Sequence, residues 1–167
     1  MTLYPGQVPF PDFYQYLIGS VAPRPICFAS TVDGKGNANL SPYSFFNVFS
    51  GNPPVLIFST TRRSRDNTTK DTLQNIEATG EVVINVVNYP MVQQMNITSC
   101  EYPKGTDEFV KGGFTKLASE KVKPWRVAES PAQMECKLLQ IIPTGSEGGA
   151  GILIICEVVA LHLNDAV

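Results

Sequence analysis

The chain has 167 residues, of which 43% are hydrophobic and 17% charged, and its formal net charge is −2. This length suits one domain with a single core, and the composition is typical of an ordered globular protein. A slightly acidic chain has no general attraction to nucleic acid or to anionic membranes, so we expect neither as a partner. No apolar run is long enough to span a bilayer, and residues 1–6 lack the basic and apolar regions of a signal peptide. We therefore expect a cytoplasmic protein.

The four cysteines are widely scattered, at positions 27, 100, 136 and 156. No two of them have the spacing of a zinc site or of a thioredoxin-type redox pair, so we expect no metal. Cys27 and Cys156 lie inside apolar runs and are predicted to be buried packing residues.

The first half of the chain is predicted to be mainly β. Prolines among aromatic residues indicate an extended N-terminal arm over residues 1–20, with one turn of helix at 12–17. A strand at 25–31 ends in a hairpin turn at 33–37, which has the sequence DGKGN. We predict a second strand over 38–50, which Asn52, Pro53 and Pro54 terminate, and a continuous apolar strand at 55–59.

The second half alternates short helices and strands. A helix is predicted at 71–79, with Asp71 or Thr72 near its N-cap and Gly80 as its stop. A β-branched strand at 81–87 and an amphipathic helix at 88–99 follow, and residues 100–131 are predicted to be mostly loop with one helical turn at 107–111. Two long strands at 133–143 and 152–163 enclose a glycine-rich turn. About six strands with two or three short helices predict a mainly β, antiparallel barrel, and no strand–glycine loop–helix unit of a Rossmann or P-loop fold is present.

Three segments carry residues suited to a planar, phosphorylated ligand. Ser30 and Thr31 close an apolar strand, although hydroxyls are also ordinary at strand ends. Residues 39–47 alternate polar and aromatic side chains around Pro42, which leaves backbone groups free at an edge or bulge; a twisted edge strand would look the same. The third segment places Ser59 and Arg62 shortly before a helix start at residues 70–72, where free N–H groups and the helix dipole stabilise a phosphate. Its alternative is a solvated basic loop beside a normal helix cap.

Together these segments resemble the signature of the flavin reductase-like, FMN-binding split-barrel family. The resemblance rests on APRPI at 22–26, on STVDGKGNANLSPYSFFN at 30–47, and on PPV at 53–55. Two further motifs follow in the order that the family pattern has: KDT at 70–72 with Asn75, and TGEVVIN at 79–85. It covers residues 20–90 with specific motifs and residues 132–163 more loosely, as the closing strands.

The resemblance implies one antiparallel split β-barrel domain over residues 1–167, which forms a homodimer with FMN at the subunit interface. Matching positions imply that the flavin ring and ribityl chain contact Ser30, Thr31, Pro42, Tyr43, Ser44 and Phe45. They also imply that Ser59, Arg62, Lys70 and Thr72 surround the phosphate while Asp71 shapes the helix start, and Arg63 or Arg65 could replace Arg62. The chain most resembles the branch of the family that has the long stretch from PRP to NLSPYSFFN. Members of that branch continue beyond the point equivalent to residues 162–165, so we expect a sequence that is truncated or that lacks this C-terminal segment.

The implied function is that of an FMN-dependent oxidoreductase with NADH or NADPH as electron donor, either a flavin reductase or a flavin-dependent reductase or oxygenase of a small molecule. Flavin chemistry requires little acid–base help from the protein, and the sequence identifies no catalytic residue. The single histidine, His162, is predicted to be structural. A non-catalytic FMN-binding electron carrier or partner module is the alternative, and a nucleic-acid-binding barrel of the OB type is disfavoured by the acidic charge.

Overall fold

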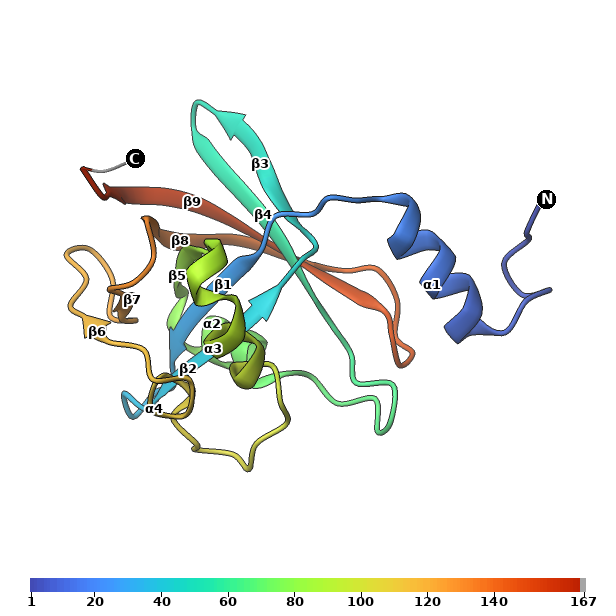
Figure 1. Cartoon of the computed structure of the whole chain (residues 1–167), viewed down its shortest axis with the longest axis horizontal. Helices are drawn as coiled ribbons and strands as arrows, with labels where there is room; N and C mark the ends of the chain where they lie inside the picture. The colour runs from blue at the N-terminus through green and yellow to red at the C-terminus, as the bar shows by residue number, and fades with distance from the viewer. Residues whose placement is uncertain (166–167) are drawn as a thin grey trace.

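The computed structural model describes residues 1–165 (Figure 1). The helices are α1 Phe10–Ser20, α2 Asp71–Thr79, the 3-10 turn η1 Tyr89–Met91, α3 Val92–Thr98 and α4 Glu108–Gly112. The strands are β1 Cys27–Val32, β2 Ala38–Tyr43, β3 Phe46–Gly51, β4 Pro54–Thr61, β5 Glu81–Val86, β6 Lys116–Leu117, β7 Arg126–Val127, β8 Ala132–Pro143 and β9 Gly151–Leu163.

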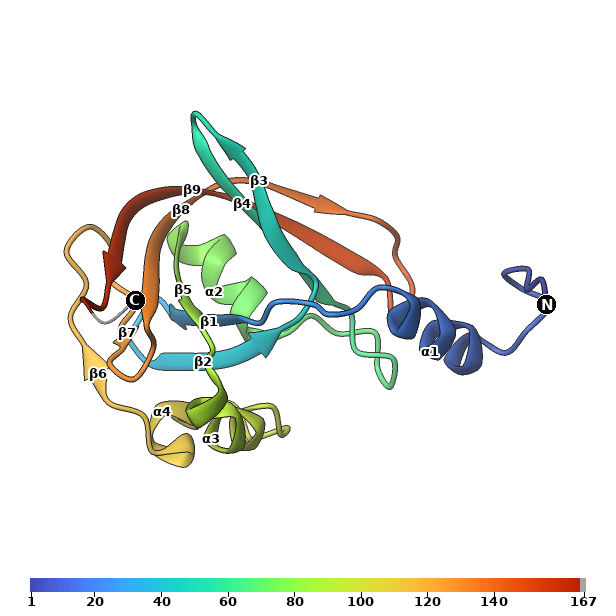
Figure 2. The same ribbon diagram turned by 45° about the horizontal axis from the view of Figure 1, so that its top comes forward.

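Seven strands form one antiparallel sheet in the order β2-β1-β5-β8-β9-β4-β3, which confirms the mainly β fold class. The long β8–β9 hairpin is the centre of this sheet: β5 pairs with the first half of β8, and β4 pairs with the first half of β9. The sheet curls around α2 (Figure 2), but its strand order begins at β2 and ends at β3, so it does not close into a barrel among the described residues. The short strands β6 and β7 pair separately.

Two groups of buried apolar side chains lie on the two faces of β1. One group packs β1, β4, β8 and β9 against α2, and it includes Phe58, Ile76 and the three thiols of Cys27, Cys136 and Cys156. The other group, with Phe28 and Phe109, lies beneath α3 and α4. The predicted burial of Cys27 and Cys156 is confirmed.

The single strand predicted over residues 38–50 is wrong. The chain leaves the sheet at residues 44–45, so that β2 pairs with β1 at one end of the sheet and β3 pairs with β4 at the other. The N–H of Ser59 donates to the carbonyl oxygen of Phe45 (2.8 Å), which fixes this crossing point. Alternating polar and aromatic residues do not reveal such a change of partner, because both halves have strand periodicity.

Other boundaries also differ from the sequence predictions. The arm carries α1, an eleven-residue helix with no buried residue, in place of a single turn at 12–17. Pro90 makes the start of the helix predicted at 88–99 a 3-10 turn, and the predicted loop at 100–131 contains α4, β6 and β7. Helix α2 has the predicted bounds.

No helix within residues 1–165 is long and apolar enough to cross a membrane. A cytoplasmic location and a single domain over the whole chain stay predictions.

Candidate functional site

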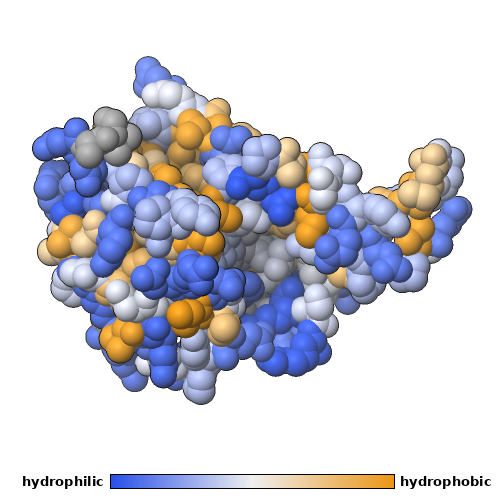
Figure 3. Space-filling view, viewed as in Figure 1, coloured by the Kyte–Doolittle hydropathy of each residue, from blue (hydrophilic) through white to orange (hydrophobic). Residues whose placement is uncertain are grey.

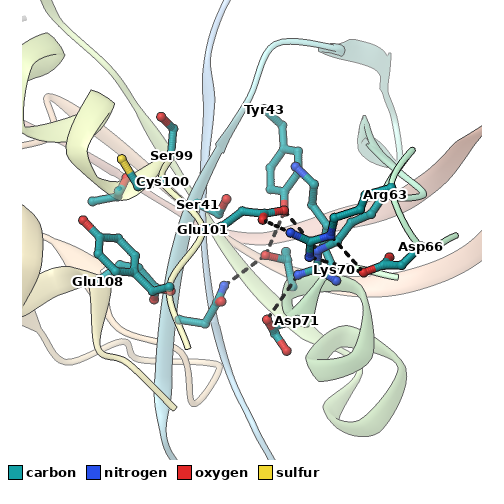
Figure 4. Close-up of a pocket in the computed structure, with 15 residues that line it drawn as sticks. Ser41, Tyr43, Arg63, Asp66, Lys70, Asp71, Ser99, Cys100, Glu101 and Glu108 are labelled. Atoms are coloured by element: carbon teal, nitrogen blue, oxygen red, sulfur yellow. Dashed lines mark hydrogen bonds and ion pairs between the residues drawn. The ribbon is translucent and has the colours of Figure 1, made fainter. Parts of the chain in front are cut away.

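A polar hollow lies between β2, the start of α2 and the loop that joins α3 to α4 (Figure 4). Arginines from the segment between β4 and α2 form part of its wall. The residues that line it are Asn39, Ser41, Tyr43, Arg63, Arg65, Asp66, Lys70, Asp71, Thr72, Thr98, Ser99, Cys100, Glu101, Tyr102 and Glu108.

The start of α2 is fixed in this wall. Thr72 is buried together with Leu73 and Ile76, which anchors the first turn of the helix to the core. No side chain of the described residues caps the start of the helix at Lys70. Free N–H groups and the positive end of the helix dipole therefore lie beside the hollow, as an anion site requires.

Hydrogen bonds between side chains tie α2 to β1 and β2. The hydroxyl of Thr72 accepts from the Tyr43 hydroxyl and from the Asn39 amide, both at 2.9 Å. The Asn75 amide donates to the hydroxyl of Thr31 at 3.0 Å. Burial raises the pKa of Tyr43 to about 12, so its hydroxyl stays protonated and remains a donor at neutral pH. These bonds hold the floor of the hollow rigid.

Three cations lie in the wall. The Lys70 ammonium lies 5.3 Å from the centre of the Tyr43 ring, and burial, followed by the charge of Arg63, lowers its pKa. The Arg63 side chain, 25% exposed, donates to the carbonyl oxygen of Thr69 and pairs with Asp71 (3.6 Å). Arg65 is mostly exposed. Arg63 is thus held to the backbone, whereas Arg65 contacts the side chains of Asp66 and Glu101.

Four carboxylates, those of Asp66, Asp71, Glu101 and Glu108, line the same hollow. Glu108 accepts from the backbone N–H of Leu40 (3.1 Å), and burial raises its pKa. Asp66 is held within its own loop by Thr68, whose hydroxyl and backbone hydrogen bonds lower the Asp66 pKa to about 2. The acids therefore outnumber the three cations when all are ionised.

Three predicted residues at or near the β2–β3 junction, Ser44, Phe45 and Ser59, are not part of the lining. Arg24 donates to the hydroxyl of Ser44 (3.2 Å) and lies over the Phe45 ring at 5.9 Å from its centre. The Tyr14 ring of α1 makes an edge contact with Phe45, with a centroid separation of 6.5 Å. Ser59 is buried, and its hydroxyl donates to the carbonyl oxygen of Thr60 (2.9 Å).

Successive side chains of a strand point to opposite faces of the sheet, so the remaining predicted residues of β1 and β2 lie on two different faces. Thr31 and Tyr43 face α2, so Ser30 and Pro42 project to the opposite face of β1 and β2. Ser30 is fully buried, and its hydroxyl has no hydrogen-bond partner within residues 1–165. Arg62 does not line the hollow: its side chain donates to the side-chain oxygen of Asn67 (2.7 Å) within the loop.

The structure thus brings Tyr43, Lys70, Asp71 and Thr72 together, with Arg63 and Arg65 as the arginines of the wall. Sequence reasoning did not select Asn39 or Ser41 as site residues, although both belong to the quoted motif. It also missed Glu101 and Glu108, which lie in the region predicted to be loop; no local pattern links that region to β2.

Comparisons with known proteins place the fold in a family. The model of the flavin reductase like domain matches residues 19–167. A protein of Aquifex aeolicus is 42% identical over 130 residues, which are 78% of this chain and 66% of that protein. The chain therefore spans slightly less than two thirds of that relative. A protein of Halalkalibacterium halodurans is 38% identical over 149 residues, 89% of this chain and 71% of that protein.

Two solved structures are similar over 99% of this chain. Nitrilotriacetate monooxygenase component B from Bacillus cereus has a TM-score of 0.94 and 32% identity, with 82% of its chain covered. The 2-nitrobenzoate 2-nitroreductase NbaA of Pseudomonas fluorescens has a TM-score of 0.87 and 25% identity, with 78% of its chain covered. The domain match and these similarities agree with the split-barrel fold, and the chain belongs to the flavin reductase like domain family.

Proposed function

We propose that the protein binds FMN with its phosphate in the polar hollow, and that it is an oxidoreductase supplied with electrons by NADH or NADPH. The observation that carries this proposal is the meeting of Arg63, Arg65 and Lys70 with the uncapped start of α2. Family membership implies a flavin, and the choice of FMN rests on this single compact anion site.

The donors of the hollow fit a phosphate monoester. Guanidinium groups bind phosphate oxygens through two parallel hydrogen bonds, and an ammonium binds as a point charge. Thr72 accepts two hydrogen bonds, which leaves its own hydroxyl hydrogen free to donate. Among the residues predicted to surround the phosphate, we propose Lys70, Asp71 and Thr72 in their predicted roles, with Arg63 or Arg65 in the place of Arg62.

For the ring and the ribityl chain we propose the neighbouring β2–β3 junction. The chain runs there through Ser44 and Phe45, outside the strand ladders, so its backbone groups other than the Phe45 carbonyl oxygen, which accepts from Ser59, would be available to a ligand. Tyr43 and Thr31 lie on the same face of the sheet as the hollow. Pro42, on the edge strand β2, would act through its backbone carbonyl group, since its side chain projects to the other face, and Ser59 would position Phe45 through its backbone hydrogen bond. Ser30 also projects to that other face, and its backbone lies in β1 between β2 and β5, so we do not propose it as a direct ring contact.

Bound flavin would accept a hydride from the nicotinamide and pass electrons to an acceptor. The role of this chain would be to bind and orient the cofactor and to exclude water. No residue needs to act as a general acid or base. The similar nitroreductase and monooxygenase component carry names from redox chemistry, which supports this class of activity.

We also propose a homodimer. Val48 and Phe49 on the outermost strand β3 are 62% and 63% exposed, and large apolar side chains gathered on an edge strand favour burial against a partner. A second copy would add surface beside the β2–β3 junction and so complete the ring site.

The visible spectrum of the purified protein tests the proposed function. We expect a flavin absorption band, or quenching of added FMN fluorescence, and loss of that band when NADH or NADPH is added without oxygen. A yellow protein that keeps its colour with both nicotinamides would support the non-catalytic FMN module. A protein that neither carries flavin nor quenches FMN would refute the proposed function.

A further inference from the structure

The two arginines of the hollow are already paired with a carboxylate of the same chain. Glu101 extends from the loop after α3, and one oxygen lies 2.8 Å from a terminal nitrogen of Arg65. Its other oxygen lies 3.7 Å from the Nε of Arg63. Glu101 thus bridges two guanidinium groups that come from the opposite wall (Figure 4).

This contact uses the donors that a phosphate would need. The remaining nitrogens of Arg63 are directed to the carbonyl oxygen of Thr69, to the hydroxyl of Thr68 (3.2 Å) and to Asp71 (3.6 Å). The Nε of Arg63 and the exposed end of Arg65 are therefore the arginine donors that face Glu101. An incoming dianion could not share them with a carboxylate without strong repulsion.

Of the two acids paired with Arg63, Glu101 is the more open to water: its side chain is 63% exposed, against 35% for Asp71. The side chain of Arg65 is 70% exposed, and pairs so open to water contribute little. Asp71, by contrast, belongs to the first turn of α2, which is anchored in the core. Of these two acids, Glu101 is the one that can leave without disturbing the fold.

We propose that Glu101 is a displaceable stand-in for the phosphate: it holds Arg63 and Arg65 in place in the free protein and is exchanged for the phosphate of the flavin nucleotide. This inference rests on the proposed function and adds a residue that sets affinity for the phosphorylated ligand. Binding then includes the work of removing Glu101, so the native residue weakens binding of phosphorylated flavin while leaving the ring unaffected.

The test compares FMN with riboflavin, which has the same ring but no phosphate. In the full chain, Glu101→Gln should tighten FMN about three- to tenfold by fluorescence quenching and leave riboflavin unchanged. Glu101→Ala should act in the same direction. Glu77→Gln is the matched control, because Glu77 is an exposed acid of α2 outside the hollow. The FMN affinity of this control variant should equal that of the native chain.

The outcomes separate the two proposals. FMN binding that is unchanged or weaker in both Glu101 variants would overturn the stand-in role while leaving the proposed function intact. Equal tightening of FMN and riboflavin would also overturn it, because the effect would then not depend on the phosphate. Absence of binding of either flavin to the native chain and the variants would overturn both proposals.

Discussion

Arg62 and Arg63 are neighbours in the sequence but have different roles in the structure. Arg63 lines the hollow, whereas the side chain of Arg62 donates to the side-chain and backbone oxygens of Asn67 in the same loop. This difference favours Arg63 over Arg62 as a ligand of the proposed phosphate, a choice that the charge pattern alone left open.

Arg63→Ala should therefore weaken FMN binding about ten- to hundredfold, the usual effect of losing hydrogen bonds to a charged group. Arg62→Ala is the matched control and should change the FMN dissociation constant less than threefold. Fluorescence titration at constant ionic strength measures both. Equal losses in the two variants would contradict the assignment of Arg63.

The most deeply buried carboxylate lies far from the hollow. Glu135 on β8 is fully buried and accepts hydrogen bonds from the backbone N–H groups of Glu120 (2.8 Å), Lys121 (2.6 Å) and Val122 (3.1 Å). The Nε2 of His162 lies 2.6 Å from Oε1 of Glu135, the same oxygen that accepts from Glu120, so the only histidine of the chain is a structural residue of β9. Burial raises the pKa of Glu135, but these hydrogen bonds outweigh it and leave the pKa below its ordinary value of 4.5.

We expect Glu135→Gln to lower the free energy of unfolding by about 2–3 kcal/mol at pH 7, because the new amide hydrogens face backbone donors. The lowered pKa means that the folded state binds this proton less readily than the unfolded chain. The stabilisation by Glu135 is therefore present above pH 4.5 and is lost as the pH falls through the lower folded-state value. In urea unfolding, the difference between this variant and the native chain should therefore become smaller as the pH is lowered from 7 through 4.5.

The control for this prediction is Glu129→Gln. Glu129 is exposed and accepts from the backbone N–H of Thr115. Its substitution should change stability by no more than about 0.5 kcal/mol.

At the scale of elements, the end of α2 depends on a glycine. Gly80 has φ 70° and its N–H donates to the carbonyl oxygen of Ile76, which is the left-handed helix end that side chains disfavour. An added Cβ would meet no atom within 4 Å, so backbone strain is the only cost.

Gly80→Ala should therefore destabilise the protein by about 1 kcal/mol in denaturant unfolding. Gly19→Ala is the comparison, since Gly19 lies in the last turns of α1 with equally open space around its Cα. That change should be neutral or slightly stabilising. A loss at Gly19 as large as that at Gly80 would contradict an explanation based on φ.

The sequence predicted elements that have local signals. α2 has an apolar face and a glycine stop, and in the turn at 33–37 the Asp33 carboxylate accepts from the N–H groups of Lys35 and Asn37, so both were predictable. The separation of β2 from β3 depends on which strand each half pairs with, and pairing is a long-range property. The approach of Glu101 to Arg65 has the same origin, because 36 residues separate them in the chain and no periodicity connects them.

At the scale of the whole molecule, the β3–β4 hairpin and the N-terminal arm extend beyond the body (Figure 1). Apolar residues are exposed on the arm in Figure 3, and α1 buries none of its residues. Phe49 on β3 lies at a register shift between Val48 and Ser50, outside the regular ladder with β4. These features support the proposed association with a second copy.

Phe49→Asp should convert the proposed dimer to a monomer in analytical ultracentrifugation, since burying an unpaired carboxylate at an interface is unfavourable. Val110→Asp is the control, because Val110 is 74% exposed on α4, on a different element, and should leave the mass unchanged. A native chain that sediments as a monomer would refute the dimer.

The distribution of the cysteines has a practical consequence. Cys100 is an exposed thiol at the wall of the hollow, while Cys27, Cys136 and Cys156 are buried in the core, where burial raises their pKa. A thiol-reactive reagent should modify Cys100 first and the other three only when the core opens. Mass spectrometry would count the modified thiols over time. Slower modification of Cys100 after FMN is added would report that the proposed flavin shields the hollow. The rate at which the other three thiols react would report how often the core opens.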